Sequence, residues 1–235
     1  MGNEKGLLQK AMDAAAQLLE AGQSIRAKED AALATRAVIL KQFERPEVST
    51  AEFSLPLLRS LSWNRFEQLC GAYFSSHGFR VDQKSHGADG GVDIRLYFRD
   101  LPSPVKLIQC KGWRRTRVDV DHIRALRGVM AREGVKEGVF VTMSTFIRPA
   151  MEEAVGGKIM TLDGAGFIER LQTLDAARKE SLLQVATEGE FWRPHCVRCG
   201  IPMNPISKTE RPFWGCPNFA RTRCKSKISL TSAFK

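Results

Sequence analysis

The sequence lacks the long apolar runs that mark membrane and exported proteins. No stretch of its 235 residues approaches the roughly 20 consecutive apolar residues that a membrane-spanning helix needs. Its first ten residues, MGNEKGLLQK, contain no apolar signal-peptide core, and Gly6 does not fit the myristoylation pattern. Internal repeats and low-complexity segments are also absent from the sequence. We therefore expect a cytoplasmic protein with no membrane partner.

Cysteine is scarce, and its six positions are unevenly spread. Cys70 and Cys110 stand alone in apolar stretches, where we expect them to pack as small hydrophobic side chains. The other four lie near the end of the sequence, as a Cys-x2-Cys pair and a Cys-x7-Cys pair. In a chain without an export signal this cluster favours metal over disulfides, and four thiolates suit one structural Zn²⁺. The expected ligands are Cys196, Cys199, Cys216 and Cys224.

Positive charge is concentrated in the same region. The net charge is +10, and residues 191–235 contain nine Lys or Arg against one Glu, a net charge of +8. Phe213, Trp214 and Phe219 lie among these cations. Basic residues interleaved with aromatic ones are typical of surfaces that bind phosphates and unstacked bases, although a basic tail that only confers solubility is the alternative. The residues expected to contact DNA here are Arg221, Arg223 and Lys225.

The chain divides into four segments. Residues 1–50 are rich in helix-forming residues and predict a helical segment, with a linker at residues 46–56. Residues 56–172 show helix and strand patterns in the order helix, three strands, helix, strand, helix, strand, helix. This order indicates an α/β fold in which helices flank a mixed sheet. Residues 173–190 look like a polar helical connector to the cysteine-rich module at 191–235.

One acidic residue stands out inside an apolar strand pattern. The predicted strand Val92–Phe98 places Asp93 between Val92 and Ile94. Because side chains alternate across a strand, we expect Val92 and Ile94 to enter one layer while Asp93 faces the other way.

A second polar pair occurs at the end of the next predicted strand. By the same alternation Gln109 and Lys111 share one face, while Ile108 and Cys110 pack behind them. If the two strands form a hairpin, Asp93 joins this polar pair. Carboxylate and amide oxygens suit Mg²⁺, and an ammonium group stabilises charge on phosphate, so the group predicts metal-assisted phosphodiester hydrolysis. A merely solvated strand face is the alternative.

These residues belong to a longer pattern of separated motifs. Residues 66–69 (FEQL), 87–94 (GADGGVDI) and 109–111 (QCK) resemble the catalytic domain of Mrr-like restriction endonucleases, which belong to the PD-(D/E)xK nuclease superfamily. Residues 124–130 (RALRGVM) and 140–142 (FVT) extend the resemblance in the same order.

The resemblance, which covers roughly residues 60–172, implies a role for each matching residue. Asp93 matches the metal-binding acid and Lys111 the catalytic lysine. Gln109 matches a position that holds an acid in most of the superfamily and Gln in the Mrr-like branch. Glu67 matches an additional acid near the metal. Together they imply a restriction-endonuclease-like fold, Mg²⁺ as the catalytic cofactor, DNA as the substrate and a role in defence.

Other polar residues carry weaker expectations. Trp113, Arg114 and Arg115 follow the catalytic strand and are expected to line the DNA groove, with coverage of the surface as the alternative. His86 and His122 are expected to be structural.

The cysteine-rich segment also resembles a known module. Residues 194–230 resemble the small zinc ribbons of bacterial type IA topoisomerases, whose second cysteine pair is similarly wide. Cleavage of both DNA strands commonly needs two active sites, so a homodimer through the N-terminal helices is a further expectation. Two alternatives to a defence nuclease stay open: a repair or recombination nuclease that recognises DNA structure, and an inactive DNA-binding protein.

Overall fold

The computed structural model describes residues 2–83, 92–112 and 114–230, with side chains from residue 20 onward. It contains two compact units, Met1–Glu44 and Arg45–Lys235. In the described part, no helix has both the length and the hydrophobicity of a membrane span.

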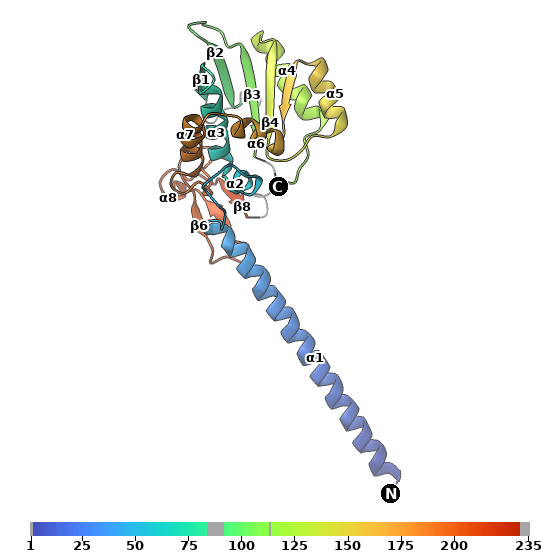
Figure 1. The fold of residues 1–235 in the computed structure, drawn as a ribbon. Helices are drawn as coiled ribbons and strands as arrows, with labels where there is room; N and C mark the ends of the chain where they lie inside the picture. Colours follow the sequence, from blue (N-terminus) through green and yellow to red (C-terminus); the bar gives the residue numbers. More distant parts are fainter. Residues whose placement is uncertain (1, 84–91, 113, 231–235) are drawn as a thin grey trace. The chain divides into compact units, whose positions relative to one another are not determined.

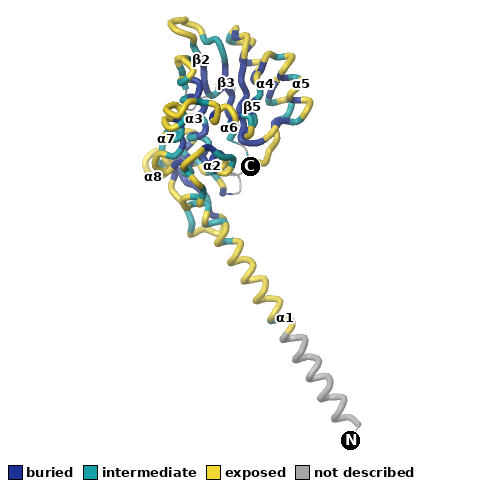
Figure 2. Tube along the Cα trace, in the orientation of Figure 1, coloured by how far each residue is buried: buried dark blue, intermediate teal, exposed yellow. Residues whose placement is uncertain are grey.

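The first unit is a single long helix. Helix α1 (Gly2–Leu40) has 39 residues and continues into the short 3₁₀ turn η1 (Lys41–Phe43). From residue 20 most of its side chains are exposed, including Ile25, Leu33 and Val38 (Figure 2). The predicted helical segment is therefore one continuous helix.

The second unit is built around a five-stranded mixed sheet (Figure 1). The strands lie in sequence order; β1–β2 and β2–β3 are antiparallel, whereas β3–β4 and β4–β5 are parallel. This confirms the predicted mixed sheet and the hairpin between its second and third strands. The elements are α2 (Leu55–Ser60), α3 (Trp63–Ser75), β1 (Phe79–Gln83), β2 (Ile94–Phe98), β3 (Lys106–Lys111), α4 (Val120–Glu133), β4 (Glu137–Thr142), α5 (Arg148–Gly156), β5 (Ile159–Leu162) and α6 (Gly164–Gln172).

Hydrophobic residues cover both faces of this sheet because successive strand side chains point to opposite sides. Ile108 and Cys110 of β3 join a cluster with residues of α2, α3 and α6. Leu107, which precedes Ile108 and pairs with Gly138 of β4, points to the other face and joins a second cluster with residues of α4 and α5. As expected, Ile108 and Cys110 pack behind the polar residues of β3.

The helices begin and end where local side chains satisfy the backbone. Asp119 caps α4 by accepting a hydrogen bond from the His122 amide, and Asp163 caps α6 in the same way from Gly166. Helix α4 ends at Gly134, whose φ of 68° lies in the left-handed region that favours glycine. Ser62 stands at the N-cap of α3, but its side chain makes no capping hydrogen bond.

The C-terminal region continues the same compact unit. Helix α7 (Ala176–Thr187) buries Leu182 and Ala186 in the cluster that contains α3, so the segment expected as a polar connector contributes to the core. Phe191, which follows it, is fully buried in this cluster. A three-stranded antiparallel sheet follows, with a short helix before its last strand. Its elements are β6 (Asn204–Ile206), β7 (Phe213–Gly215), α8 (Phe219–Thr222) and β8 (Lys227–Ser229).

Candidate nuclease centre and cysteine cluster

Asp93 lies immediately before β2, beside the polar end of β3. The hairpin pairs Ile94 with Ile108, and the Asp93 amide donates to the Ile108 carbonyl at 3.0 Å. One expectation was wrong here: Val92 and Ile94 enter different hydrophobic clusters instead of one layer. The physical reason is that strict alternation holds only within the regular strand, and β2 begins after Asp93.

Two hydrogen bonds fix the Asp93 carboxylate. Its Oδ2 accepts one from Gln109 Nε2 at 2.8 Å and one from the Cys110 backbone amide at 2.7 Å. Gln109 is only 4% exposed, so its amide has little freedom to turn away. The predicted convergence of Asp93 and Gln109 is therefore present, and Gln109 holds Asp93 in place through its nitrogen.

Glu67 reaches the same point from helix α3. The pKa of Glu67 is raised to about 8: burial is the largest cause, the negative charge of Asp93 adds to it, and the positive charge of Lys111 opposes both effects. The charges of both Asp93 and Lys111 act on the Glu67 carboxyl group, so the three side chains lie near one another. Glu67, Asp93 and Lys111 therefore share one electrostatic site, as the sequence predicted.

The oxygen-rich side of this site fits a divalent cation. Two carboxylates and a carboxamide oxygen are ligands that Mg²⁺ accepts. Burial and the neighbouring charge of Asp93 both disfavour the ionised form of Glu67, and a cation bound between the two acids would favour it. The residues present thus fit a metal centre formed by Asp93, Glu67 and the amide oxygen of Gln109.

The chain that follows β3 returns to the start of α3. A Cβ added at Gly112 would lie 3.4 Å from the Cα of Trp63, so the two backbones pack closely. Arg114 Nη2 donates to the Leu61 carbonyl at 3.2 Å. Burial, followed by the charge of Arg59, lowers the pKa of Arg114 to about 10. Arg114 thus ties this loop to the end of α2, which limits its availability to a DNA phosphate.

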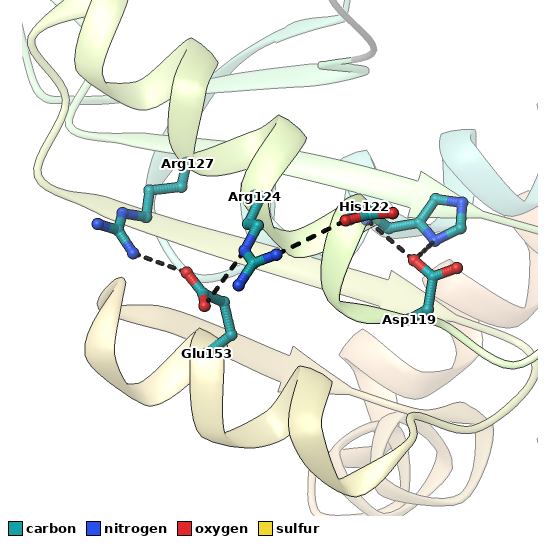
Figure 3. A network of polar contacts seen from close by, with 6 residues as sticks. Asp119, His122, Arg124, Arg127 and Glu153 are labelled. Atoms are coloured by element: carbon teal, nitrogen blue, oxygen red, sulfur yellow. Dashed lines mark hydrogen bonds and ion pairs between the residues drawn. The ribbon is translucent and has the colours of Figure 1, made fainter.

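The other residues for which the sequence predicted a role lie in different environments. Arg115 is exposed, as a phosphate contact requires, while Trp113 and His86 lie outside the described residues. His122 Nδ1 lies 2.5 Å from Asp119 Oδ1, at the start of α4 (Figure 3). The same helix surface carries Arg124 and Arg127, which both pair with Glu153 of α5. His122 therefore belongs to a surface ion-pair network, in keeping with the structural role expected for it.

The four clustered cysteines come together in the C-terminal module. Their sulfur atoms lie within 4.8 Å of one another, and Cys196–Cys224 and Cys199–Cys216 are each separated by 3.8 Å. Tetrahedral Zn²⁺ with Zn–S bonds of about 2.3 Å requires sulfurs about 3.8 Å apart. The cluster therefore fits one four-coordinate zinc ion.

The thiols of this cluster ionise unequally. Burial, opposed by a backbone hydrogen bond from Asn218 and reinforced by the neighbouring thiols, raises the pKa of Cys216 to about 12. At Cys196 burial also opposes ionisation, but hydrogen bonds from Ser226 and from the backbone outweigh it and lower the pKa to about 6. A bound cation would favour the thiolate form of all four ligands.

The surface beside the cluster has the predicted basic and aromatic character. Arg221, Arg223 and Lys225 are exposed. Next to them is a cavity of about 690 Å³ whose lining includes Phe213, Phe219, Lys225 and Lys227. These groups suit a nucleic acid strand, although their contact with DNA stays a prediction.

Comparison with known proteins identifies the central domain. Residues 58–171 match the family model described as Restriction endonuclease, Mrr_cat. These residues form an Mrr-type restriction endonuclease domain. The proposed centre at Glu67, Asp93, Gln109 and Lys111 lies inside it, whereas the cysteine cluster lies beyond its end.

Solved structures of similar chains include two restriction endonucleases. The DNA modification-dependent restriction endonuclease AspBHI is 19% identical with a TM-score of 0.41, covering 60% of this chain and 42% of that one. The MspJI restriction endonuclease, solved with a 27-mer oligonucleotide, is 20% identical with a TM-score of 0.37, covering 54% of this chain and 32% of that one. The chain thus spans less than half the length of either protein. The comparison with curated proteins found no match.

Some residues that support the Mrr-type domain carried no sequence signal. Asn64, at the start of α3, hydrogen-bonds to His195 of the cysteine module, 131 positions away. Arg65 donates to the carbonyls of Val185 and Glu188. Contacts at such separations follow no local periodicity, so only homologous sequences or a structure would reveal them.

The raised pKa of Glu67 predicts a pH-dependent stability. Between the ordinary Glu value of 4.5 and about 8, the folded protein keeps a proton that the unfolded chain has released, so stability falls as pH rises through this interval. Glu67→Gln removes this dependence. We expect the variant, measured by urea unfolding without Mg²⁺ or Mn²⁺, to gain stability relative to wild type from pH 5 to pH 8 and to level off above. The exposed Glu180→Gln serves as control, and a constant difference between Glu67→Gln and wild type would contradict the assignment.

The geometry of the cysteine cluster predicts about one zinc per chain. Elemental analysis of purified protein measures it. Cys196→Ser combined with Cys199→Ser should remove the zinc, because two ligands from one side of the tetrahedron are lost. A matched double change, Cys70→Ala with Cys110→Ala, should keep it. Full zinc content in the first variant would show that the ligands lie elsewhere.

Proposed function

We propose that this protein is a metal-dependent DNA endonuclease, with Mg²⁺ at the Mrr-type centre and Zn²⁺ in a structural role at the cysteine cluster. The observation that carries the proposal is the convergence of Glu67, Asp93, Gln109 and Lys111 within the family's domain. A role in defence against foreign DNA follows from the family resemblance. The alternatives are a repair nuclease and an inactive DNA-binding protein, and the experiments below can favour either of them.

The chain's own groups divide the work of phosphodiester hydrolysis. When bound, Mg²⁺ would act as a Lewis acid toward a phosphate oxygen. Asp93 is held in one orientation by Gln109 and the Cys110 amide, so little reorganisation precedes cation binding. Lys111, next to both acids, supplies a positive charge that can stabilise the developing charge on the scissile phosphate.

DNA binding is assigned to two basic surfaces. Arg115 lies exposed after the catalytic strand, and the exposed cations of the cysteine module lie beside its aromatic cavity. Phosphate contacts of this kind hold the duplex without selecting a sequence. Both surfaces belong to the same compact unit as the nuclease centre.

Substitution of the central residues tests the activity. Asp93→Ala should abolish Mg²⁺-dependent plasmid nicking while DNA binding persists, because the carboxylate holds the cation and not the duplex. Lys111→Ala should also lose cleavage, with metal binding retained. Gln109→Glu should retain activity, because that position holds an acid in most of the superfamily.

The control for these variants is Asp121→Ala, an acid on the exposed surface of α4. Cutting at the wild-type rate by both Asp93→Ala and Lys111→Ala would place the activity at another site. If the wild type cuts no plasmid, linear, single-stranded or methylated DNA with Mg²⁺ or Mn²⁺, the inactive DNA-binding alternative is the better description.

Charge removal on the cysteine module tests DNA binding. The triple variant Arg221→Gln, Arg223→Gln and Lys225→Gln should bind DNA more weakly. Its plot of log affinity against log salt should be shallower by about 2 to 3, since each lost phosphate contact reduces the slope by about 0.9. Fluorescence anisotropy at several salt concentrations measures both.

A matched triple variant removes exposed cations from other elements, at Lys136, Arg170 and Arg178. It should keep the wild-type slope. Equal slopes for wild type and both triple variants would show that the basic module binds something other than DNA.

A further inference from the structure

The first turn of α3 makes a two-way contact with the cysteine module. Asn64, only 9% exposed, donates from Nδ2 to His195 Nδ1 at 2.6 Å. Its Oδ1 accepts from the His195 backbone amide at 3.2 Å. Both ends of the Asn64 carboxamide bind His195. The two directional hydrogen bonds therefore fix the rotation of α3 about its axis as well as its distance from the cysteine module, whereas apolar packing would fix only the distance.

Two further contacts hold the same turn. The Ser62 amide donates to the Phe191 carbonyl at 2.8 Å. The Arg65 guanidinium donates to the carbonyls of Val185 and Glu188 at 2.8 and 2.9 Å, which closes the end of α7. The start of α3 is thus bonded to residues 185–195 at three positions.

His195 in turn is fixed by the cysteine cluster. Cys196, the next residue, lies in a tight knuckle in which its amide donates to Ile201 and its carbonyl accepts from Gly200, both at 2.8 Å. Its sulfur lies 3.8 Å from Cys224. A metal bound by the four cysteines would hold this knuckle closed and thereby fix the position of His195.

Helix α3 connects the Asn64 contact to the proposed nuclease centre. Asn64 and Glu67 are three residues apart and so share one face of α3. Gly112, which follows Lys111, packs against the backbone of Trp63. A displacement of the first turn of α3 would therefore move Glu67 relative to Asp93 and Lys111.

We propose that Asn64 and His195 are positioning residues of the nuclease centre, through which the metal-closed cysteine module holds Glu67 against Asp93. The inference rests on the proposed function of Glu67 and Asp93 as a metal centre. By this mechanism the cysteine module affects how tightly the centre at Glu67 and Asp93 binds a divalent metal, although none of its cysteines is a ligand there.

The test measures Mn²⁺ binding to the full-length protein, from the electron paramagnetic resonance signal of free Mn²⁺, with zinc content determined on the same samples. Asn64→Ala should weaken Mn²⁺ binding about 10-fold, the loss typical of an outer-shell contact, with zinc unchanged. Asn64→Asp should restore much of the affinity, because a carboxylate still accepts from the His195 amide. If Asn64→Ala does not fold, His195→Ala replaces it, since that change removes only the side-chain bond.

The matched control is Asn204→Ala, which removes a hydrogen bond between Asn204 and Arg193 within the module. It should leave Mn²⁺ binding unchanged. A double-mutant cycle then separates positioning from general loosening: in a Glu67→Ala background, Asn64→Ala should cause little further loss, because its effect acts through Glu67.

Three results would overturn the proposal: Mn²⁺ affinity of Asn64→Ala within twofold of wild type, an equal loss in Asn204→Ala, or additive losses in the cycle. Failure of the proposed function gives a different result. In that case Asp93→Ala would bind Mn²⁺ as tightly as wild type.

Discussion

The burial of Glu67 beside Asp93 is the constraint around which the proposed nuclease centre is organised. One acid comes from a helix and the other from the edge of a hairpin, and burial, with the charge of Asp93 adding to it, raises the pKa of Glu67 to about 8. Nothing in the local preferences of α3 or β2 favours this proximity. The packed core behind α3 and the two hydrogen bonds on Asp93 maintain it. Such a site is unfavourable for the protein alone and favourable with a cation, which is what preorganisation for metal-assisted chemistry requires.

The sheet supplies the geometry that makes this possible. Strand β3 pairs antiparallel with β2 and parallel with β4, so it lies at the centre of the sheet with both faces covered. Its alternating residues divide cleanly, with Ile108 and Cys110 in one cluster and Leu107 in the other. The end of such a strand is a rigid support. Gln109 and Lys111 therefore hold their positions with little help from the neighbouring loop.

Periodicity predicted most of the central domain, because its elements are short and bounded by clear capping and turn residues. The strand predicted at Val92–Phe98 is β2, which begins two residues later at Ile94, and the polar convergence followed from alternation on β3. The prediction failed where the chain leaves regular structure, at Val92. It also missed the contribution of α7 to the core. Polar residues occur throughout this helix, so its buried residues, Leu182 and Ala186, do not produce a recognisable apolar stripe in the sequence. The contact of Asn64 with His195 joins residues too far apart for sequence periodicity to register.

The cysteine module illustrates why such long-range contacts arise. Its three strands have three residues each, too few to form a stable core, and units of this size need metal or cross-links to fold. Four thiols within 4.8 Å could supply the first through a bound metal, and hydrogen bonds to α3 and α7 supply a second means of stabilisation. A module held in both ways does not move freely on a linker. Its basic surface is therefore fixed relative to the nuclease centre in the same compact unit. The fold would therefore fix the distance between DNA bound to the module and the proposed catalytic residues. A flexible tether would leave that distance variable.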